Sequence, residues 1–201
     1  MMSLGEVAPE VPSRVARRNS AMLRWFGRCG LRAAGWRVTG NLPDTEKILV
    51  IGAPHTSNWD WVVAVFVMWA LDIRMTVLIK DTVFWGPLGW FLRLTGAMPV
   101  NRRNPAGIAE DVAANIRAAE RIIVVITPEG TRSRVEKWKT GFLRIAEAAR
   151  IPIVQVSFNY PTRTLHLGPI AEVSGDVEAD ITRIRDYYRP FTGCRPENQS
   201  P

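Results

Sequence analysis

The sequence predicts a single α/β domain with a largely parallel β-sheet flanked by helices, and an amphipathic helix near the N-terminus. Its 201 residues fall within the usual range of one domain and are enough to bury a core. From Lys47 onward, short runs rich in Val and Ile alternate with helical segments. Strands that are apolar at nearly every position are covered on both faces, which is typical of parallel sheets with helices between the strands.

The first predicted element runs from Arg14 to about Trp36, where Trp, Phe and Leu recur among several arginines. Gly27, Gly30 and Gly35 are expected to loosen or break this helix. Its composition is typical of a helix lying in the headgroup plane of a membrane. A helix that packs on its own domain and leaves its arginines in water has the same pattern, so the sequence leaves both interpretations open.

The remaining elements follow from β-branched apolar runs, which predict strands, and from longer mixed segments, which predict helices. In chain order we expect a strand at 48–52, a helix at 59–71, a strand at 75–79, a helix at 84–94, a short strand at 97–100, a helix at 107–119, a strand at 121–126, a helix at 140–150, a strand at 153–158, one more strand at 163–167 and a closing helix at 177–188. We divide the chain into a flexible N-terminus (1–13), the amphipathic, candidate membrane-interface helix (14–40), the α/β domain (41–192) and a flexible tail (193–201).

The charge balance predicts a polyanionic partner, because the formal net charge is +7. We find no nucleic-acid-binding motif, and the aromatic residues stand in apolar runs rather than between basic ones. The chain also has eight Trp, a residue that favours membrane interfaces. A phospholipid surface is therefore the expected partner.

The expected location is the cytoplasmic face of the cell membrane, held peripherally. Only Cys29 and Cys194 occur and we find no signal peptide, which indicates a reducing compartment. The longest apolar run, 61–71, is closed by Asp60 and Asp72, whereas a membrane span needs roughly 20 residues. We expect no transmembrane helix.

Candidate site residues follow the predicted strands, since ligands of open α/β sheets bind beyond the carboxyl ends of the strands. His55 and Asp60 follow the first strand. On one continuous helix they would be about 140° apart, so they can pair only if the helix begins between them, with Ser57 as its N-cap. A carboxylate that accepts from one imidazole nitrogen leaves the other free to take a proton from a hydroxyl.

Two simpler interpretations stand beside this one. Ser-x-x-Asp is also an ordinary capping box, in which Asp60 would only satisfy helix amides. A histidine more often has a structural role, and His166, between Leu165 and Leu167 in an alternating strand, is interpreted in that way.

Basic residues follow two further strands. Arg102 and Arg103 follow one, and Arg132 follows another, with Lys137 and Lys139 shortly after it. Converging guanidinium groups suit a phosphate. Surface arginines are often simply solvated, but two such loops at one end of the sheet favour a binding site.

Four blocks together resemble the ordered motifs of the glycerolipid acyltransferases, above all the bacterial 1-acylglycerol-3-phosphate acyltransferases. They are HTSNWD, GAMPVNRR, PEGTRS with KWKTGF after it, and IPIVQVSF, and they span about half of the chain. The resemblance implies that His55 is the general base and Asp60 its partner. It also implies that the acceptor phosphate binds Arg102, Glu129, Gly130, Thr131, Arg132 and Lys139, and that Ile151 and Pro152 lie near the acyl donor.

The expected reaction is direct transfer of a fatty acyl group from acyl-CoA or acyl-carrier protein to a hydroxyl of a lysophosphatidate-like lysophospholipid, in phospholipid synthesis. No covalent acyl-enzyme, metal or further cofactor is expected, and backbone amides near Ser57 or Gly130 are candidate donors to the oxyanion. Pro99, Asn101 and Thr140 depart from the family pattern and leave the acceptor open. The alternatives are another acceptor such as lyso-ornithine lipid, a thioester hydrolase with the same His and Asp, and a non-catalytic basic protein.

Overall fold

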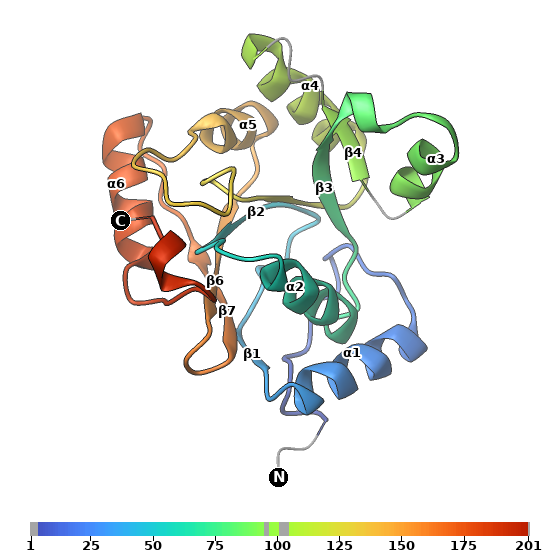
Figure 1. Cartoon of the computed structure of the whole chain (residues 1–201). Helices are drawn as coiled ribbons and strands as arrows, with labels where there is room; N and C mark the ends of the chain where they lie inside the picture. The colour runs from blue at the N-terminus through green and yellow to red at the C-terminus, as the bar shows by residue number, and fades with distance from the viewer. Residues whose placement is uncertain (1–3, 95–96, 101–104, 201) are drawn as a thin grey trace.

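The computed structural model describes residues 4–94, 97–100 and 105–200, which form one α/β domain (Figure 1). Its strands are β1 (Arg37–Gly40), β2 (Lys47–Ala53), β3 (Met75–Lys80), β4 (Ala97–Val100), β5 (Ile122–Ile126), β6 (Ile153–Asn159) and β7 (Thr164–Ile170). Its helices are α1 (Ala21–Ala33), α2 (Trp59–Ala70), α3 (Gly86–Leu94), α4 (Pro105–Ala118), α5 (Gly141–Ala149) and α6 (Val177–Tyr188), with short 3₁₀ turns η1 (Asp81–Val83) and η2 (Pro196–Asn198).

The strands form one seven-stranded sheet in the order β1-β7-β6-β2-β5-β3-β4. Neighbours from β6 to β4 are all parallel, and β1 is parallel to β7. Only β6 and β7 are antiparallel, because a short turn joins them and leaves no room for a crossover helix. The predicted fold class, a largely parallel sheet flanked by helices, is confirmed.

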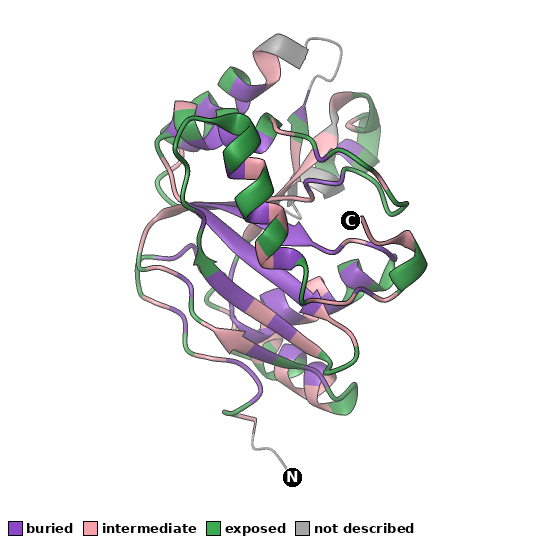
Figure 2. Cartoon of the chain, turned by 90° about the vertical axis from the view of Figure 1, so that its left-hand side faces the viewer, coloured by how far each residue is buried: buried purple, intermediate pink, exposed green. Residues whose placement is uncertain are grey.

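Helices cover both faces of this sheet, and β2 contributes to each core. Ile48 and Val50 pack toward α1 and α2, whereas Leu49 and Ile51 pack toward α4, α5 and α6. Successive side chains of a strand point to opposite faces, so a strand buried on both has to be apolar throughout. Figure 2 shows the sheet as a buried layer between more exposed helices.

The expected helix from Arg14 to Trp36 is shorter in the structure. It begins after Ser20, whose hydroxyl caps it by accepting from the Leu23 amide at 3.3 Å. The residues before Ser20 run along the domain instead, where Arg17 bridges to Ile73. The end of the expected segment turns at Gly35 (φ 71°) and becomes β1, a strand that the sequence analysis missed.

The glycines that were expected to weaken this helix let it approach α2 closely. A Cβ on Gly27 would lie 2.3 Å from the Ala70 nitrogen, and one on Gly30 would lie 2.3 Å from a ring carbon of Phe66. Small residues on this face of α1 therefore fix the contact between the two helices.

The described residues near both ends of the chain make contacts with the domain. Val7 and Val11 are buried against the core, because apolar side chains recur in the N-terminal segment. At the other end, the Arg195 amide donates to the Thr56 hydroxyl at 3.0 Å, and the Gly193 amide donates to Gln199. The division of the chain at residues 13, 41 and 193 stays a prediction.

Candidate active site

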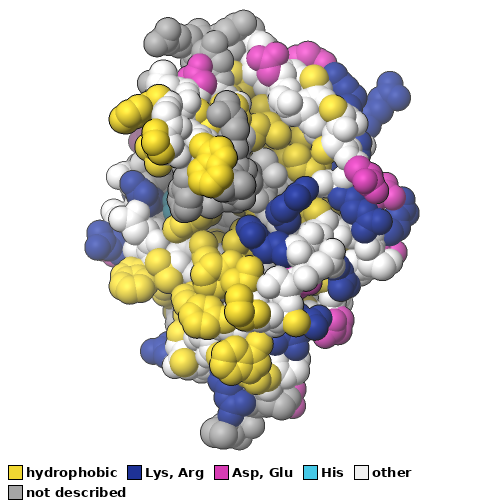
Figure 3. All heavy atoms as spheres, turned by 90° about the vertical axis from the view of Figure 1, so that its right-hand side faces the viewer, with side chains coloured by type: hydrophobic (Ala, Val, Ile, Leu, Met, Phe, Trp, Pro, Cys, Tyr) yellow, Lys and Arg dark blue, Asp and Glu magenta, His cyan; other side chains and the backbone are white. Residues whose placement is uncertain are grey.

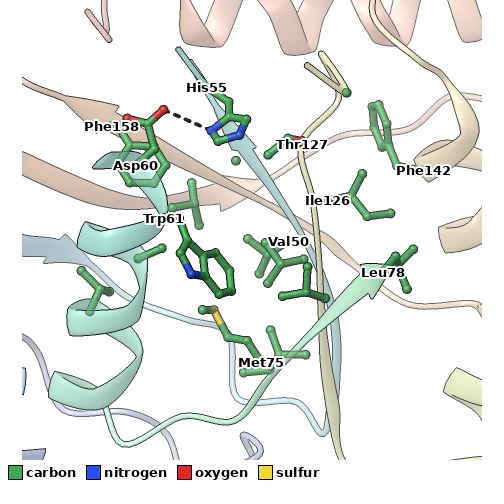
Figure 4. A pocket seen from close by; sticks show the side chains of 18 of the residues that line it. Val50, His55, Asp60, Trp61, Met75, Leu78, Ile126, Thr127, Phe142 and Phe158 are labelled. Atoms are coloured by element: carbon green, nitrogen blue, oxygen red, sulfur yellow. Dashed lines mark hydrogen bonds and ion pairs between the residues drawn. The ribbon is translucent and has the colours of Figure 1, made fainter. Parts of the chain in front are cut away.

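His55 and Asp60 lie at the carboxyl end of β2, the central strand, with β5 and β6 on either side. The chain turns after Ala53, and α2 begins at Trp59, between the two residues as expected. Its N-cap is Asn58 and not Ser57, although the Ser57 hydroxyl accepts from the Trp59 amide at 3.2 Å. The His55 Nδ1 and Asp60 Oδ2 atoms are 3.1 Å apart (Figure 4). The Asp60 side chain is 1% exposed and that of His55 is 19% exposed, so the imidazole reaches the surface of the site and its partner does not.

The Asp60 carboxylate holds the whole turn together. Its Oδ2 also accepts from the backbone amides of Thr56 and Ser57 at 2.8 and 2.9 Å, while its Oδ1 accepts from the Tyr160 hydroxyl at 2.7 Å. Burial raises the pKa of Asp60, but these hydrogen bonds together lower it below its ordinary value. An ionised carboxylate can only accept, so the Nδ1–H of His55 is the donor in this contact, and in the neutral imidazole Nε2 is then the free acceptor. Asp60 therefore caps and orients at once.

Glu129 contacts the backbone of His55. Its carboxylate is buried, 3% exposed, and accepts from the backbone amide of His55 at 2.7 Å. Burial raises the pKa of Glu129 to about 7, although this hydrogen bond and one from Ser200 oppose the shift. The resemblance implied that Glu129 contacts the acceptor, but its carboxylate is directed at the backbone of the His55 loop.

Arg132 and Lys139 lie at the mouth of the site. The Arg132 guanidinium donates to the Asn58 side chain at 2.7 Å, which fixes it beside the start of α2. Gly130 has a φ of 66°, and a Cβ there would lie 2.6 Å from the Lys139 ammonium nitrogen. Lys139 therefore lies across Gly130, and this arrangement requires glycine at that position.

The remaining predicted site residues are Thr131, Arg102, Ile151 and Pro152. The Thr131 hydroxyl accepts from Ser133 within its own loop. Arg102 falls outside the described residues. Ile151 and Pro152 precede β6 and so lie at its amino end, about 20 Å along the strand from the His55 edge. The structure does not bring these two residues to the site.

An apolar cavity of about 800 Å³ opens from the His55 ring into the domain, lined by α2, by strands of the sheet and by residues of α4 and α5. His55, Asp60 and Arg132 line its polar end. Side chains of Val50, Trp61, Met75, Leu78 and others point into the space beneath the imidazole (Figure 4). Its volume and its lining of apolar walls with a few polar groups at one end are those of a small-molecule site.

His166, the second histidine, is not part of this site. Its Nδ1 is 2.9 Å from the Thr39 hydroxyl, and its ring stacks on Phe191 at a centroid distance of 6.4 Å. The structural role expected for it agrees with these contacts.

The site thus consists of a part-exposed histidine and a buried aspartate above an apolar cavity, on a largely parallel sheet. The acyltransferase family model matches residues 36–159, more than half of the chain, and the chain belongs to this family. The resemblance drawn from the four motifs is thereby confirmed.

Two relatives are named 1-acyl-sn-glycerol-3-phosphate acyltransferase. One, from Streptococcus pneumoniae, is 26% identical over 136 residues, which cover 63% of this chain and 50% of the relative. The other, from Cocos nucifera, is 32% identical over 94 residues, which cover 44% of this chain and 30% of the relative. The chain thus spans half or less of the length of these relatives.

The fold is also that of a solved structure, the 1-acyl-sn-glycerophosphate (LPA) acyltransferase PlsC from Thermotoga maritima. The TM-score is 0.57 at 17% sequence identity, and the match covers 84% of this chain and 76% of that one. At this identity the likeness concerns the fold.

Two residues of the site, Asn58 and Tyr160, were not predicted from the sequence. Asn58 stands inside the HTSNWD block, and its position beside Asp60 was a usable signal. Tyr160 directly follows β6, so the rule that led to His55, inspection of the residue after each strand, applied to it as well.

Proposed function

We propose that the protein transfers a fatty acyl group from an acyl thioester to a hydroxyl of a lysophosphatidate-like acceptor, with His55 as the general base. The single observation that carries this proposal is the His55–Asp60 pair at 3.1 Å, placed where the apolar cavity meets Arg132. The unprotonated Nε2 takes the proton of the acceptor hydroxyl as its oxygen attacks the thioester carbonyl. Asp60 then stabilises the imidazolium. The carbon–sulfur bond breaks, the acyl group stays on the acceptor oxygen, and the sulfur leaves as a thiol after taking the proton back from the imidazolium.

The cavity suits the acyl chain of the donor, because its walls are apolar and each buried methylene contributes about 0.8 kcal/mol. Whether the donor is acyl-CoA or acyl-carrier protein, its thioester has to lie at the His55 end. We propose no metal or further cofactor for this reaction.

Arg132 and Lys139 suit the acceptor phosphate, because both are exposed cations at the mouth of the cavity. The backbone amides expected to bind the oxyanion are already engaged, since Ser57 donates to Asp60 and Gly130 donates to Thr127. The same two cations are therefore our candidates for stabilising the developing charge.

We propose a phospholipid surface as the partner of this protein. The proposed location is the cytoplasmic face of the membrane, because that face is anionic. Among the described residues, no helix has the length and apolar character needed to cross a bilayer. Large apolar side chains instead gather on the side of the molecule formed by α1, α2 and α3 (Figure 3). This aromatic face consists of Met22, Trp25, Phe26, Trp59, Trp61, Val62, Trp85, Leu88 and Trp90, all of them exposed.

The aromatic face and the cavity meet at Trp61, which is 52% exposed and also lines the cavity. A lipid substrate could then pass between bilayer and site without crossing water. The Met22→Ser/Trp25→Ser double variant should bind vesicles of anionic phospholipid less tightly, because these side chains are 74% and 60% exposed on α1. Vesicle co-sedimentation measures this, and binding equal to wild type would contradict the assignment of the face.

The test of the reaction is transfer from a labelled long-chain acyl-CoA, or acyl-carrier protein, to a panel of acceptors. The panel holds lysophosphatidate, glycerol phosphate, lysophosphatidylethanolamine and lyso-ornithine lipid, and His55→Ala is compared with the control His166→Ala. We expect transfer to lysophosphatidate that His55→Ala abolishes and His166→Ala retains. Release of free fatty acid with every acceptor ignored would indicate a hydrolase, and the absence of any reaction would contradict the proposal.

A further inference from the structure

The His55–Asp60 pair has a neighbour that neither the motifs nor the family match includes. Tyr160 follows β6 and stands one residue beyond the matched region. Its hydroxyl donates to Asp60 Oδ1 at 2.7 Å, on the side of the carboxylate opposite to His55. Among the hydrogen bonds of the described residues, this is the one that Oδ1 receives, whereas Oδ2 receives those of His55, Thr56 and Ser57.

We infer that Tyr160 is a positioning residue for the reaction proposed above, one that holds the Asp60 carboxylate in the orientation that fixes the His55 imidazole. The inference rests on that proposed function for its kinetic consequence, but its structural part stands on the contacts alone.

Asp60 needs this donor because it is nearly inaccessible to water, at 1% exposure. Without the Tyr160 hydroxyl, Oδ1 would be a buried, charged acceptor without a partner, which is costly. The carboxylate would relieve this by rotating or by admitting water, and either change would disturb the bond from Oδ2 to His55.

Tyr160 itself is held firmly, as a positioning residue has to be. Its ring packs edge-on against the buried Trp36 at a centroid distance of 4.9 Å and an interplanar angle of 86°. Its backbone amide donates to the Thr192 carbonyl at 2.9 Å. The position of the tyrosine is thereby fixed by Trp36, which precedes β1, and by Thr192, which follows α6.

Tyr160 does not line the cavity, so it should not contact either substrate. The kinetic effect of its loss should therefore differ from that of losing a substrate-binding residue. Loss of the hydroxyl should lower kcat and leave the KM of both substrates unchanged, because only the readiness of His55 to accept the proton is altered.

The test compares Tyr160→Phe with the matched control Tyr188→Phe. Each substitution removes one tyrosine hydroxyl that donates a 2.7 Å hydrogen bond, to Asp60 in the first case and to the Ile51 carbonyl in the second. We expect Tyr160→Phe to lower kcat about 10-fold, the effect of a lost hydrogen bond to a charged group. Tyr188→Phe should keep the wild-type kcat, whatever it does to the melting temperature.

A second measurement uses the ring nitrogen resonances of the two histidines in the substrate-free protein. The His55 Nδ1–H signal should shift in Tyr160→Phe and stay in place in Tyr188→Phe, with His166 as the internal reference. This readout decides on Tyr160 even where no acyl transfer is detected with any acceptor, so failure of the inference and failure of the proposed function remain distinct. A folded Tyr160→Phe protein with wild-type kcat, or with an unshifted His55 signal, would overturn the inference.

Discussion

Replacement of Val50 by Phe should shorten the acyl chain that the protein accepts. Val50 lies on β2, is 7% exposed and lines the cavity beneath His55. The substitution adds about four carbon atoms to the side chain and so displaces about four methylenes of a bound chain. At about 0.8 kcal/mol per buried methylene, the loss is about 3 kcal/mol, on the order of 100-fold in kcat/KM for a long-chain donor.

The assay is kcat/KM for a series of donors from short to long, at a fixed acceptor concentration. Short chains should react as in wild type, because Val50 lies three residues, about 10 Å, before the end of β2 that leads to His55, and a short chain ends before reaching it. Val50→Ala, which enlarges the cavity, is the matched control and should retain long-chain donors. A Val50→Phe protein that is folded, and whose kcat/KM falls equally for all chain lengths or for none, would refute the placement of the acyl chain.

Three further substitutions test the polar groups of the site. Asp60→Asn should lower kcat on the order of 1,000-fold or more, because the imidazole loses the partner that fixes its tautomer; a near wild-type kcat in steady-state assays would leave Asp60 with a capping role only. Arg132→Ala should raise the KM for the acceptor more than that for the donor, and equal effects would remove its phosphate assignment. Glu129→Gln should alter the pH dependence of the free energy of unfolding. Burial raises the pKa of Glu129 to about 7, so its protonated form stabilises the fold at low pH. This contribution is lost as the pH rises from about 4.5 to 7. Chemical denaturation across this pH range should show that the free energy of unfolding of the wild type falls by at most about 3 kcal/mol relative to that of the variant. The same pH dependence in both proteins would contradict the pKa shift.

The elements that could be predicted from sequence are those whose signal is local. β2 is apolar from residue 48 to residue 53 because both faces are covered, and α2 begins within one residue of the start that Ser57 and Asp60 predict. β1 could not be found in this way, since Trp36 continues the apolar pattern of the preceding helix and Arg37 is exposed. Its strand conformation depends on pairing with β7, far away in the chain.

The residues of the site likewise fall into those with a local sequence signal and those whose contacts are distant in the chain. The spacing of His55 and Asp60 was sufficient to predict that they pair if a helix begins between them. The contact of Glu129 with the His55 amide, and that of Arg195 with Thr56, join segments 74 and 139 residues apart and leave no periodic trace in the sequence. The C-terminal segment resembles a polar tail because its contacts are made mainly by backbone groups and small polar side chains.

Direct transfer with His55 as the general base can be followed in a single turnover with a labelled long-chain acyl thioester. The reaction is quenched with acid and analysed for label on the protein, the acceptor and free fatty acid. We expect the label to pass to lysophosphatidate without appearing on the protein, and we expect His55→Ala to abolish this transfer while His166→Ala retains it. Label bound covalently to the protein, or transfer that survives in His55→Ala, would contradict this mechanism.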